Sequence, residues 1–469
     1  MYNILINNVK NSYDYEELIK IFLPPDSFSI LTERPPGDIG VSQLSYLIPN
    51  QIPVISFNEK LSNDKNEIKR EIYRTLSELT GKKPPWGILT GVRPVKLTGE
   101  IAAKGYDLKK TLTEDYLVSE EKTGLLIETY NYQQEILGAP DPDSIGMYIG
   151  IPFCPTRCLY CSFTSNQKSK EEIDRYLVSL KKEIEYVGKR MKDTGIYPES
   201  IYIGGGTPTT LDEAQLDDLL TTIFRNIDTD KLKEFTVEAG RPDTITKEKL
   251  EVIKSHGVKR ISINPQTMNQ ETLDLIGRLH KPQDITDAFR IRNEAGIEDV
   301  NCDLITGLPK ETIKDFKYTL DEIFKLDPEN ITIHTLAVKR ASRLIEEDPT
   351  YHYRQGEIVK EMLDYADKEL RKREYRPYYL YRQKHMAGSF ENVGWCKKDT
   401  PCIYNIRIME EKQSILALGA GGISKIYYPG ENRLERIPNV SNYEIYIERL
   451  DEMIERKELN FFKEVEKCR

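Results

Sequence analysis

The sequence predicts an α/β protein whose centre is a partial (β/α)6 barrel, with an N-terminal α/β domain before it and a mixed C-terminal domain after it. Three observations lead to this fold class. Six strand candidates follow one another, helical patterns separate them, and a linker rich in Pro and Asp precedes the series. Because parallel neighbours need a crossover connection, the alternation indicates a parallel sheet, and six units form less than the full eight-fold barrel.

Residues 1–143 are predicted to form the N-terminal α/β domain, to which the sequence attaches no role. Proline pairs at 35–36 and 84–85 mark turns, and Pro-Asp-Pro-Asp at 140–143 indicates the linker. The predicted elements are two strands and two helices, at 2–6, 53–57, 67–80 and 122–137.

Residues 144–338 are predicted to form the barrel. In such sheets ligands bind at the carboxyl ends of the strands, so these ends mark the expected site. The strand candidates are 146–151, 200–203, 234–238, 259–264, 299–305 and 330–335. The helical patterns between them are 170–192, 211–227, 246–255, 272–276 with 285–294, and 313–326.

Residues 339–469 are predicted to form a C-terminal domain that covers the substrate. This region contains a long helical pattern at 355–373, a stretch rich in Tyr and Arg, a glycine loop at 419–422 and a charged final helix.

Composition and charge narrow the class of protein. A chain of 469 residues with a formal net charge of −9 lacks the basic surface that general nucleic-acid binding needs. No apolar run approaches the length of a membrane span, and the N-terminus does not resemble a secretory signal. Seven cysteines, an odd number in a large chain, do not indicate a disulfide framework and fit the reducing cytosol.

Three cysteines stand in one short loop directly after the first barrel strand. Cys154, Cys158 and Cys161 have the spacing C-x3-C-x2-C, and neither a fourth Cys nor a His lies nearby. Structural zinc takes four protein ligands, and a ferredoxin-type cluster takes four cysteines. Three thiolates therefore predict a 4Fe–4S cluster with one open iron, which can bind a small chelating molecule. The alternative is a chance grouping of structural cysteines.

Polar and glycine residues stand at further strand ends. The glycine stretch at 204–209 brings backbone close to a ligand and leaves N–H donors free, and it lacks the Gly-Lys-Ser/Thr of a P-loop. A tight structural turn is the alternative.

Carboxylates and amides can bind ribose hydroxyls, and Arg can clamp a carboxylate, although a carboxylate here can also simply cap a helix. The polar residues are Glu238, Gln266, Arg278 and Asp303.

The cysteine spacing, with the glycine stretch after the second strand, resembles the radical S-adenosylmethionine (radical SAM) superfamily. Four strings resemble its oxygen-independent coproporphyrinogen III oxidase group, at 148–154, 204–209, 303–309 and 418–421. Two more, 379–384 and 390–395, are similar to the HemZ-type branch of coproporphyrinogen dehydrogenases. The resemblance covers about residues 146–425.

The resemblance implies a metal centre, a 4Fe–4S cluster on the three cysteines, with S-adenosylmethionine on its open iron. The best-understood members bind a second S-adenosylmethionine. The first molecule would contact Tyr148, Tyr160, Gly205, Glu238 and Ile423, of which Tyr148 and Glu238 would serve catalysis. The second would contact Gly206, Thr207, Gln266, Arg278, Asp303 and Ala337.

The activity implied by the resemblance is an oxidoreductase step of anaerobic porphyrin and heme biosynthesis in the cytoplasm. Coproporphyrinogen III would lose carbon dioxide from two propionate side chains, and two vinyl groups would remain in protoporphyrinogen IX. A reductant such as a flavodoxin or ferredoxin would supply the electron. Buried walls would protect the radical from water and oxygen.

Two positions depart from the pattern of the decarboxylating enzymes. Phe163 stands where these enzymes carry a fourth cysteine, and the heme-chaperone branch also has Phe there. Gly150 stands where a His usually precedes Ile-Pro-Phe. Two alternatives therefore stay open: a heme-binding chaperone that keeps the cluster without oxidase activity, and a radical SAM enzyme that acts on another tetrapyrrole.

Three other features admit a functional and a structural interpretation. Cys396 and Cys402 would need Cys302 and Cys468 to hold a second cluster, and we expect them to be dispensable for iron. His334 faces either the site or the core. A basic stretch around Arg382 and Lys384, interleaved with tyrosines, is either a solvated helix end or a dock for an anionic tetrapyrrole. Its other members are Arg371, Lys372, Arg373, Tyr375, Arg376, Tyr378, Tyr379, Tyr381 and His385, with Lys339, Arg340 and Arg343 nearby.

Overall fold

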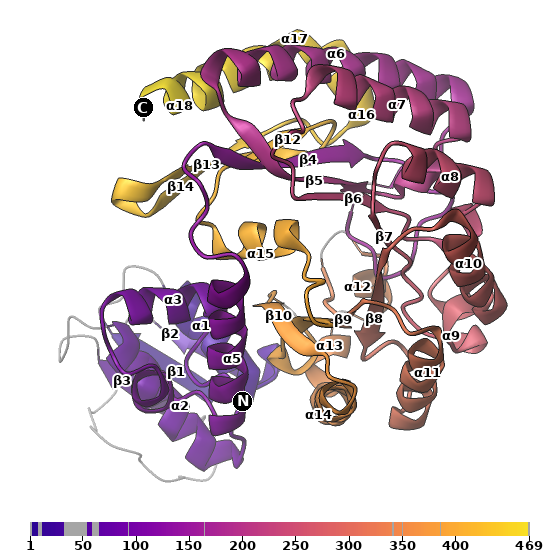
Figure 1. Cartoon of the computed structure of the whole chain (residues 1–469). Coiled ribbons are helices and arrows are strands. Elements are labelled where there is room, and N and C mark those ends of the chain that lie inside the picture. The colour runs from indigo at the N-terminus through magenta and orange to yellow at the C-terminus, as the bar shows by residue number, and fades with distance from the viewer. Residues whose placement is uncertain are drawn as a thin grey trace.

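The computed structural model describes most of the chain. The described residues are 2–7, 12–31, 54–58, 65–91, 93–163, 165–339, 342–348, 350–384 and 386–467. They form a small sheet near the N-terminus and one large curved sheet with helices along its outer side (Figure 1). Arg340, His385 and Cys468 lie outside the described residues.

Six parallel strands form the centre of the large sheet, each paired with the next strand in sequence. The predicted α/β class and strand order are confirmed. The strands are β4 (Ser144–Ile151), β5 (Tyr197–Gly205), β6 (Glu234–Glu238), β7 (Arg260–Ser262), β8 (Asp299–Thr306) and β9 (Asn330–Thr335). The helices between them are α6 (Lys170–Thr194), α7 (Glu213–Asn226), α8 (Lys247–Ser255), α9 (Gln270–Leu275), α10 (Pro282–Ala295) and α11 (Ile313–Leu326).

One predicted strand is shorter than its pattern suggested. β7 ends at Ser262 rather than at 264. Pro265 follows three residues later and has no N–H to give to a ladder, and Gln266 has a φ of +68°. The chain therefore leaves the sheet early and turns across its carboxyl edge.

The two faces of the barrel strands differ in chemistry. Side chains such as Ile149, Ile203 and Val300 are fully buried in the main hydrophobic core against the helices. The residues beside them along the strands point to the inner face, where Tyr148 stacks on Tyr202 with ring centroids 6.4 Å apart. This alternation has the period of two that strand geometry imposes, and it leaves the inner face polar and aromatic.

The C-terminal third of the chain extends both edges of the barrel sheet. β12 pairs in parallel with β4, and β11 pairs antiparallel with β9. α15 lies on the inner side, because its Tyr404 stacks on Tyr202 at 4.9 Å. The strands are β10 (Arg376–Tyr381), β11 (Asn392–Cys396), β12 (Ile415–Leu418), β13 (Ile423–Tyr428) and β14 (Arg433–Pro438). The helices are α12 (Leu344–Glu347), α13 (Tyr351–Arg354), α14 (Gly356–Lys372), α15 (Ile403–Glu410), α16 (Tyr443–Glu448), α17 (Leu450–Lys457) and α18 (Lys463–Lys467).

A buried ion pair attaches the C-terminal helices to the barrel. Glu183 of α6 and Lys457 of α17 are both fully buried, with Oε1 and Nζ 2.7 Å apart. The other Glu183 oxygen accepts the backbone N–H of Gly419 at 2.7 Å. Although burial opposes ionisation, Lys457 and these hydrogen bonds hold the pKa of Glu183 below its usual value. The pair therefore fixes the glycine loop between β12 and β13.

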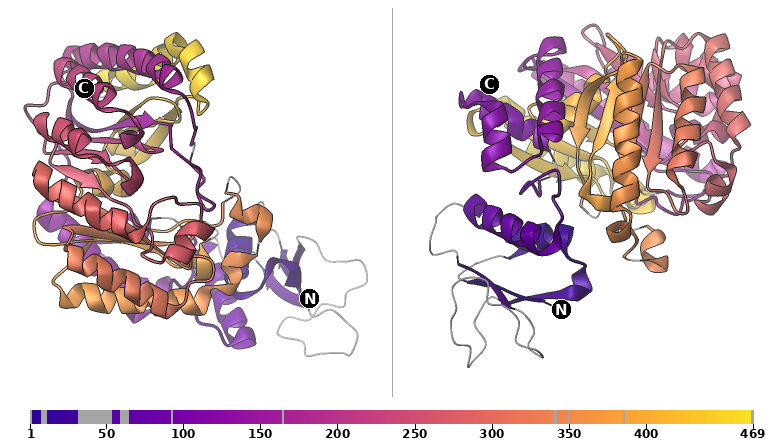
Figure 2. Two further views of the ribbon diagram at one scale, coloured as in Figure 1. Left: turned by 90° about the vertical axis from the view of Figure 1, so that its right-hand side faces the viewer. Right: turned by 90° about the horizontal axis from the view of Figure 1, so that it is seen from below.

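The N-terminal part forms a second, smaller core beside the barrel (Figure 2). Its parallel sheet has the order β2-β1-β3. Trp86 and Leu89 join the main core whereas Ile88 stays in the small one, and Trp86 Nε1 donates to Glu391 at 2.8 Å. The domain boundaries at 143 and 338 stay a prediction. The elements are β1 (Tyr2–Asn7), α1 (Tyr13–Phe22), β2 (Phe28–Leu31), β3 (Val54–Asn58), α2 (Lys65–Thr80), α3 (Pro94–Ala103), α4 (Leu108–Lys110) and α5 (Glu120–Ile136).

Within the described residues, no helix is both long and apolar enough to cross a membrane.

Candidate cofactor site at the carboxyl ends of the barrel strands

The cysteine loop, residues 152–163, lies at the carboxyl end of β4. Backbone hydrogen bonds hold it on two sides, from Cys154 N to Asn166 O at 3.0 Å and from Leu159 N to Ile276 O at 2.9 Å. Cys154 and Cys158 are buried, and Cys161 is partly exposed. The structure therefore brings the three predicted ligands together in one anchored loop.

The three thiols influence one another electrostatically. Burial raises the pKa of Cys154 to about 11, a hydrogen bond with Thr207 opposes the rise, and Cys161 and Cys158 add to it. Thiolates in such a group need a cation, which a metal centre supplies. Across the described chain, no group of three or more His, Cys, Asp or Glu side chains is placed so that it could hold a metal ion.

The glycine stretch after β5 packs directly against the cysteine loop. A Cβ atom at Gly206 would lie 2.8 Å from Cys154 Sγ and 2.4 Å from Phe153 O, so only glycine fits there. Thr207 N donates to Phe153 O at 2.8 Å, and the Thr207 hydroxyl lies 3.5 Å from Cys154 Sγ. Gly205 has a φ of +119°, which also favours glycine.

Glu238, at the end of β6, faces the same glycine stretch. A Cβ atom at Gly204 would lie 2.8 Å from Glu238 Oε2. Desolvation and the charge of Asp303 raise the pKa of Glu238 to about 8, against the backbone N–H of Gly205. Burial and Glu238 together raise the pKa of Tyr148. The two predicted catalytic residues therefore lie near each other and near the glycines.

Arg278 crosses from the loop after α9 to the cysteine loop. Its Nη1 donates to Asn264 O at 2.5 Å, and its Nη2 donates to Tyr160 OH at 3.3 Å. Arg278 is 6 % exposed, and its Nε has no hydrogen-bond partner among the described residues. One donor of the guanidinium is thus left for a ligand.

Asp303 of β8 is paired on the inner face. Its Oδ1 lies 3.5 Å from His334 Nε2 and accepts from Asn301 Nδ2 at 2.7 Å. Burial raises the pKa of Asp303, but the charge and hydrogen bond of His334 outweigh it and keep that pKa low. The other His334 nitrogen lies 3.4 Å from Tyr381 OH. His334 therefore faces the site.

The other residues predicted to contact cofactor are spread more widely. Gln266, in the segment after β7, forms an isolated β-bridge with Leu304 of β8. Ala337, just after β9, forms one with Met386. Ile423 begins β13 and is 46 % exposed. Within the described chain, the side chains of these three residues make no hydrogen bond or ion pair with the cysteine loop.

Several buried polar atoms near these strand ends have no partner among the described residues. An unsatisfied buried polar group costs about 1–3 kcal/mol, so such atoms favour a polar ligand or water in the functional protein. They are Thr236 Oγ1, Ser262 Oγ, Asn264 Oδ1, Arg278 Nε and both ring nitrogens of His280. The residues therefore fit a ligand with ammonium, carboxylate and hydroxyl groups, as S-adenosylmethionine has.

Sequence patterns did not single out two inner-face tyrosines, Tyr202 and Tyr404. Tyr404 stacks on both Tyr148, at 6.3 Å, and Tyr202. The position of Tyr202, two residues before Gly204 in β5, is a signal that strand alternation could have given. Tyr404 comes from a helix more distant in sequence and has no such signal.

The basic stretch does not form an open binding surface around Arg382. The interpretation of this stretch as a binding site for an anionic tetrapyrrole is therefore corrected. Arg382 is 5 % exposed, donates to Leu89 O and to Ser389 O, and lies over the Trp86 ring. Lys384 lies over the ring of Tyr13. These cations bind the N-terminal part of the chain, because aromatic rings and carbonyl oxygens surround them there.

Cys396 and Cys402 are also occupied by structural contacts. Cys396 Sγ donates to Tyr132 OH at 3.6 Å, and Cys402 Sγ donates to Glu234 at 3.2 Å. Cys302 is fully buried in the main core. Their dispensability for iron stays a prediction.

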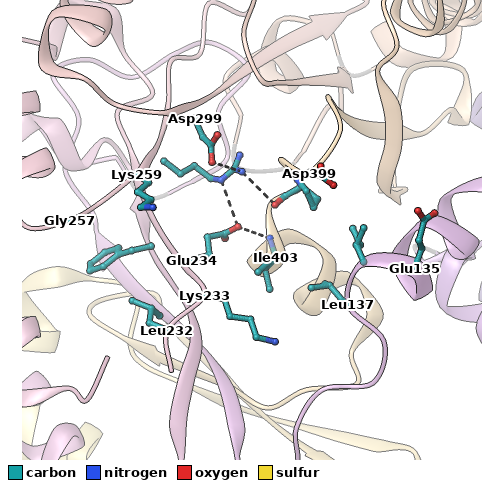
Figure 3. Close-up of a pocket in the computed structure, with 14 residues that line it drawn as sticks. Glu135, Leu137, Leu232, Lys233, Glu234, Gly257, Lys259, Asp299, Asp399 and Ile403 are labelled. Atoms are coloured by element: carbon teal, nitrogen blue, oxygen red, sulfur yellow. Dashed lines mark hydrogen bonds and ion pairs between the residues drawn. The ribbon is translucent and has the colours of Figure 1, made fainter. Parts of the chain in front are cut away.

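A pocket of about 580 Å³ lies at the opposite, amino end of the barrel strands (Figure 3). Charged residues line it, and most of them are paired. Arg260 pairs with Asp299 at 3.1 Å and donates to Thr400 O at 2.9 Å. Glu234 accepts the backbone N–H groups of Ile403 at 2.6 Å and Tyr404 at 3.2 Å, and so caps α15.

Comparison with known proteins agrees with this geometry. The radical SAM superfamily profile matches residues 148–323. A Bacillus subtilis protein, oxygen-independent coproporphyrinogen-III oxidase-like protein HemZ, is 37 % identical over 415 residues, covering 86 % of this chain and 82 % of HemZ. The heme chaperone HemW of B. subtilis is 37 % identical over 193 residues, 41 % of this chain and 50 % of HemW.

One solved structure has the same fold. Escherichia coli coproporphyrinogen III oxidase (HemN), described as a radical SAM enzyme, superposes with a TM-score of 0.53 at 21 % identity, over 70 % of this chain and 73 % of HemN. The chain therefore belongs to the radical SAM superfamily. Within it, the chain is a relative of the HemZ-like proteins of the oxygen-independent coproporphyrinogen III oxidase group.

Proposed function

We propose that this protein is a cytosolic radical SAM oxidoreductase that converts coproporphyrinogen III to protoporphyrinogen IX. The observation that carries the proposal is the packing of the cysteine loop against Gly206 and Thr207, with Glu238 beside the same glycines. The names of the HemZ and HemN relatives support the tetrapyrrole substrate. The reductant would be a small electron carrier such as a flavodoxin or ferredoxin.

The chain's residues fit the cofactors of the family. Cys154, Cys158 and Cys161 would hold a 4Fe–4S cluster. When bound, the cluster and S-adenosylmethionine supply one-electron reduction and a carbon radical that can take a hydrogen atom. The first S-adenosylmethionine would contact Tyr148, Tyr160, Gly205, Glu238 and Ile423. A second would contact Gly206, Thr207, Gln266, Arg278, Asp303 and Ala337.

Glu238 would bind a cationic part of the cofactor. Its carboxyl group holds a proton at neutral pH in the free protein, because its pKa is about 8. A nearby ammonium or sulfonium charge favours the ionised form, so binding would release that proton. Glu238 would thus orient the cofactor through a charge-assisted hydrogen bond.

The inner-face aromatic residues would shape the substrate side. The rings of Tyr379 and Tyr381 stack with nearly parallel planes, at 9° with ring centroids 6.1 Å apart. Tyr379 is buried and Tyr381 is half-buried, so Tyr381 would be the ring of this pair that meets a large ring system. Tyr148, Tyr202 and Tyr404 stack on one another in the same cluster and would exclude water from the reacting atoms.

The test is an anaerobic assay of reconstituted protein with coproporphyrinogen III, with products identified by mass. We expect loss of two carbon dioxide molecules through an early monovinyl intermediate, because each propionate must reach the same reacting atoms in turn. The Cys158→Ala protein is the matched control and should give no product.

A heme chaperone is the second candidate function. Phe163, the last residue of the cysteine loop, is 65 % exposed. HemW shares 37 % identity with this chain over 193 residues. In the same preparation, tight heme binding without release of carbon dioxide would favour this function and refute the oxidase proposal.

A further inference from the structure

A buried guanidinium group is hydrogen-bonded to the cysteine loop at Thr156, which stands between two of the cysteines in sequence. Arg241, three residues after β6, is 3 % exposed. Its Nη1 donates to Thr156 Oγ1 at 2.6 Å and to Thr156 O at 3.4 Å. Thr156 stands between Cys154 and Cys158, and its hydroxyl donates onward to Gly277 O at 3.3 Å. Arg241 therefore ties three loops at the carboxyl edge together.

The other side of the Arg241 guanidinium is fixed by Asp243. Nε donates to Oδ1 at 3.0 Å and Nη2 donates to Oδ2 at 2.9 Å. This two-point geometry locks the plane of the guanidinium, which a lysine could not reproduce. Asp243 is partly exposed, so water screens its charge, whereas Arg241 lies behind it.

Arg241 and Arg278 support the cysteine loop in corresponding ways. Arg241 binds Thr156, between the first and second cysteines, and Arg278 binds Tyr160, between the second and third. Two buried cations thus lie beside three groups that become anionic when they bind metal.

We propose that Arg241 is a positioning residue for the cluster ligands and that its charge raises the reduction potential of the cluster. The proposal rests on the 4Fe–4S assignment but not on the tetrapyrrole substrate. A one-electron reduction makes the cluster more negative, and a fixed cation in a buried site favours that state. The bond to Thr156 keeps this cation at a constant distance from the thiolates.

The test is a redox titration of the reconstituted full-length protein, followed by the electron paramagnetic resonance signal of the reduced cluster. We expect Arg241→Gln to lower the ratio of reduced to oxidised cluster about tenfold at a fixed potential, which is about 59 mV for one electron. Asp243→Asn should shift the ratio in the opposite direction, because it leaves the Arg241 charge uncompensated. Arg241→Lys keeps the charge but not its fixed position, so it should shift the ratio less than Arg241→Gln does.

A second pair of variants separates position from charge. Thr156→Val removes the hydroxyl but no charge, so it should speed iron loss to a chelator and leave the potential near that of the parent. Arg260→Gln removes an equally buried arginine at the opposite end of the barrel, and it should lower the melting temperature without moving the potential.

An unchanged potential in both Arg241→Gln and Asp243→Asn would overturn the proposal. If Arg241→Gln does not assemble a cluster, Asp243→Asn decides alone, since it keeps Arg241. A parent protein without any cluster would overturn the cofactor assignment and this inference together. Failure to convert coproporphyrinogen III would refute only the proposed substrate.

Discussion

Both ends of the barrel hold buried polar groups, but the charged groups around the amino-end pocket are paired, whereas several polar groups at the carboxyl end are not. At the amino end, Arg260, Asp299 and Glu234 satisfy one another or cap α15 around the pocket of about 580 Å³. At the carboxyl end, Arg278 Nε and Asn264 Oδ1 are buried without a partner in the described part of the chain. The pocket at the amino end of the strands is therefore not where the chemistry is expected.

The difference has a thermodynamic meaning. When charged groups pair inside the protein, their attraction offsets or exceeds the free energy lost on removing them from water. Removal of one partner leaves an unpaired buried charge. Polar groups without partners cost stability until a ligand meets them, and binding then returns that free energy. Saturation of polar groups indicates a structural region, and unsatisfied groups indicate a binding site.

The largest expected effect is on the cysteine loop. Changing Cys154, Cys158 or Cys161 singly to Ala should abolish the cluster, because two thiolates do not hold the three irons that the ligands would bind. Anaerobically reconstituted parent protein should carry about four irons per chain, and the variants should lose the charge-transfer absorbance. An intact cluster in the Cys158→Ala protein would contradict the ligand assignment.

The amino end should show the opposite behaviour, a loss of stability without loss of cofactor. Arg260→Met leaves Glu234 and Asp299 without their cation and should cost about 3–5 kcal/mol in the free energy of unfolding. Urea unfolding followed by circular dichroism measures this cost. Iron per folded chain should equal that of the parent, and a halved iron content would show that the two ends are coupled.

Glu238→Gln should weaken cofactor binding while the protein keeps its iron. Loss of a hydrogen bond to an ionised carboxylate costs about 1.5–3 kcal/mol, roughly ten- to a hundredfold in Kd. Glu311→Gln is the matched control, because Glu311 is also buried and its pKa is raised to about 7, yet it binds Thr267 instead. Equal affinities in calorimetry would mean that Glu238 only supports the loop after β6.

The raised pKa of Glu238 also predicts a smaller effect on stability. Between the ordinary carboxyl pKa of 4.5 and the folded value of about 8, the folded protein holds a proton that the unfolded chain has released. The stability contribution of this group therefore falls as pH rises through that window. Without cofactor, the parent should lose melting temperature relative to Glu238→Gln from about pH 4.5 to about pH 8. A constant difference would place the Glu238 pKa outside this range.

Local patterns explain how much of this molecule could be predicted. The six barrel strands follow from periodicity and crossover length, and the cysteine loop follows from spacing within eight residues. Contacts between distant segments could not be predicted. Arg382 resembles a solvent-exposed cation in sequence, but it lies over Trp86, and Tyr404 reaches the inner face only because Glu234 caps α15.

The smallest effect is expected for the remaining cysteine pair, Cys396 and Cys402. Each thiol has an oxygen partner, Tyr132 OH or Glu234, and both lie in a hydrophobic cluster on the amino side of the barrel. The double Ala variant should lose about 1 kcal/mol of stability per hydrogen bond and hold as much iron as the parent. Cys158→Ala, assayed beside it, shows what loss of a true ligand looks like. If the double variant instead loses half of its iron, the amino end carries a second cluster, and paired polar groups no longer distinguish the structural end of the barrel from the functional one.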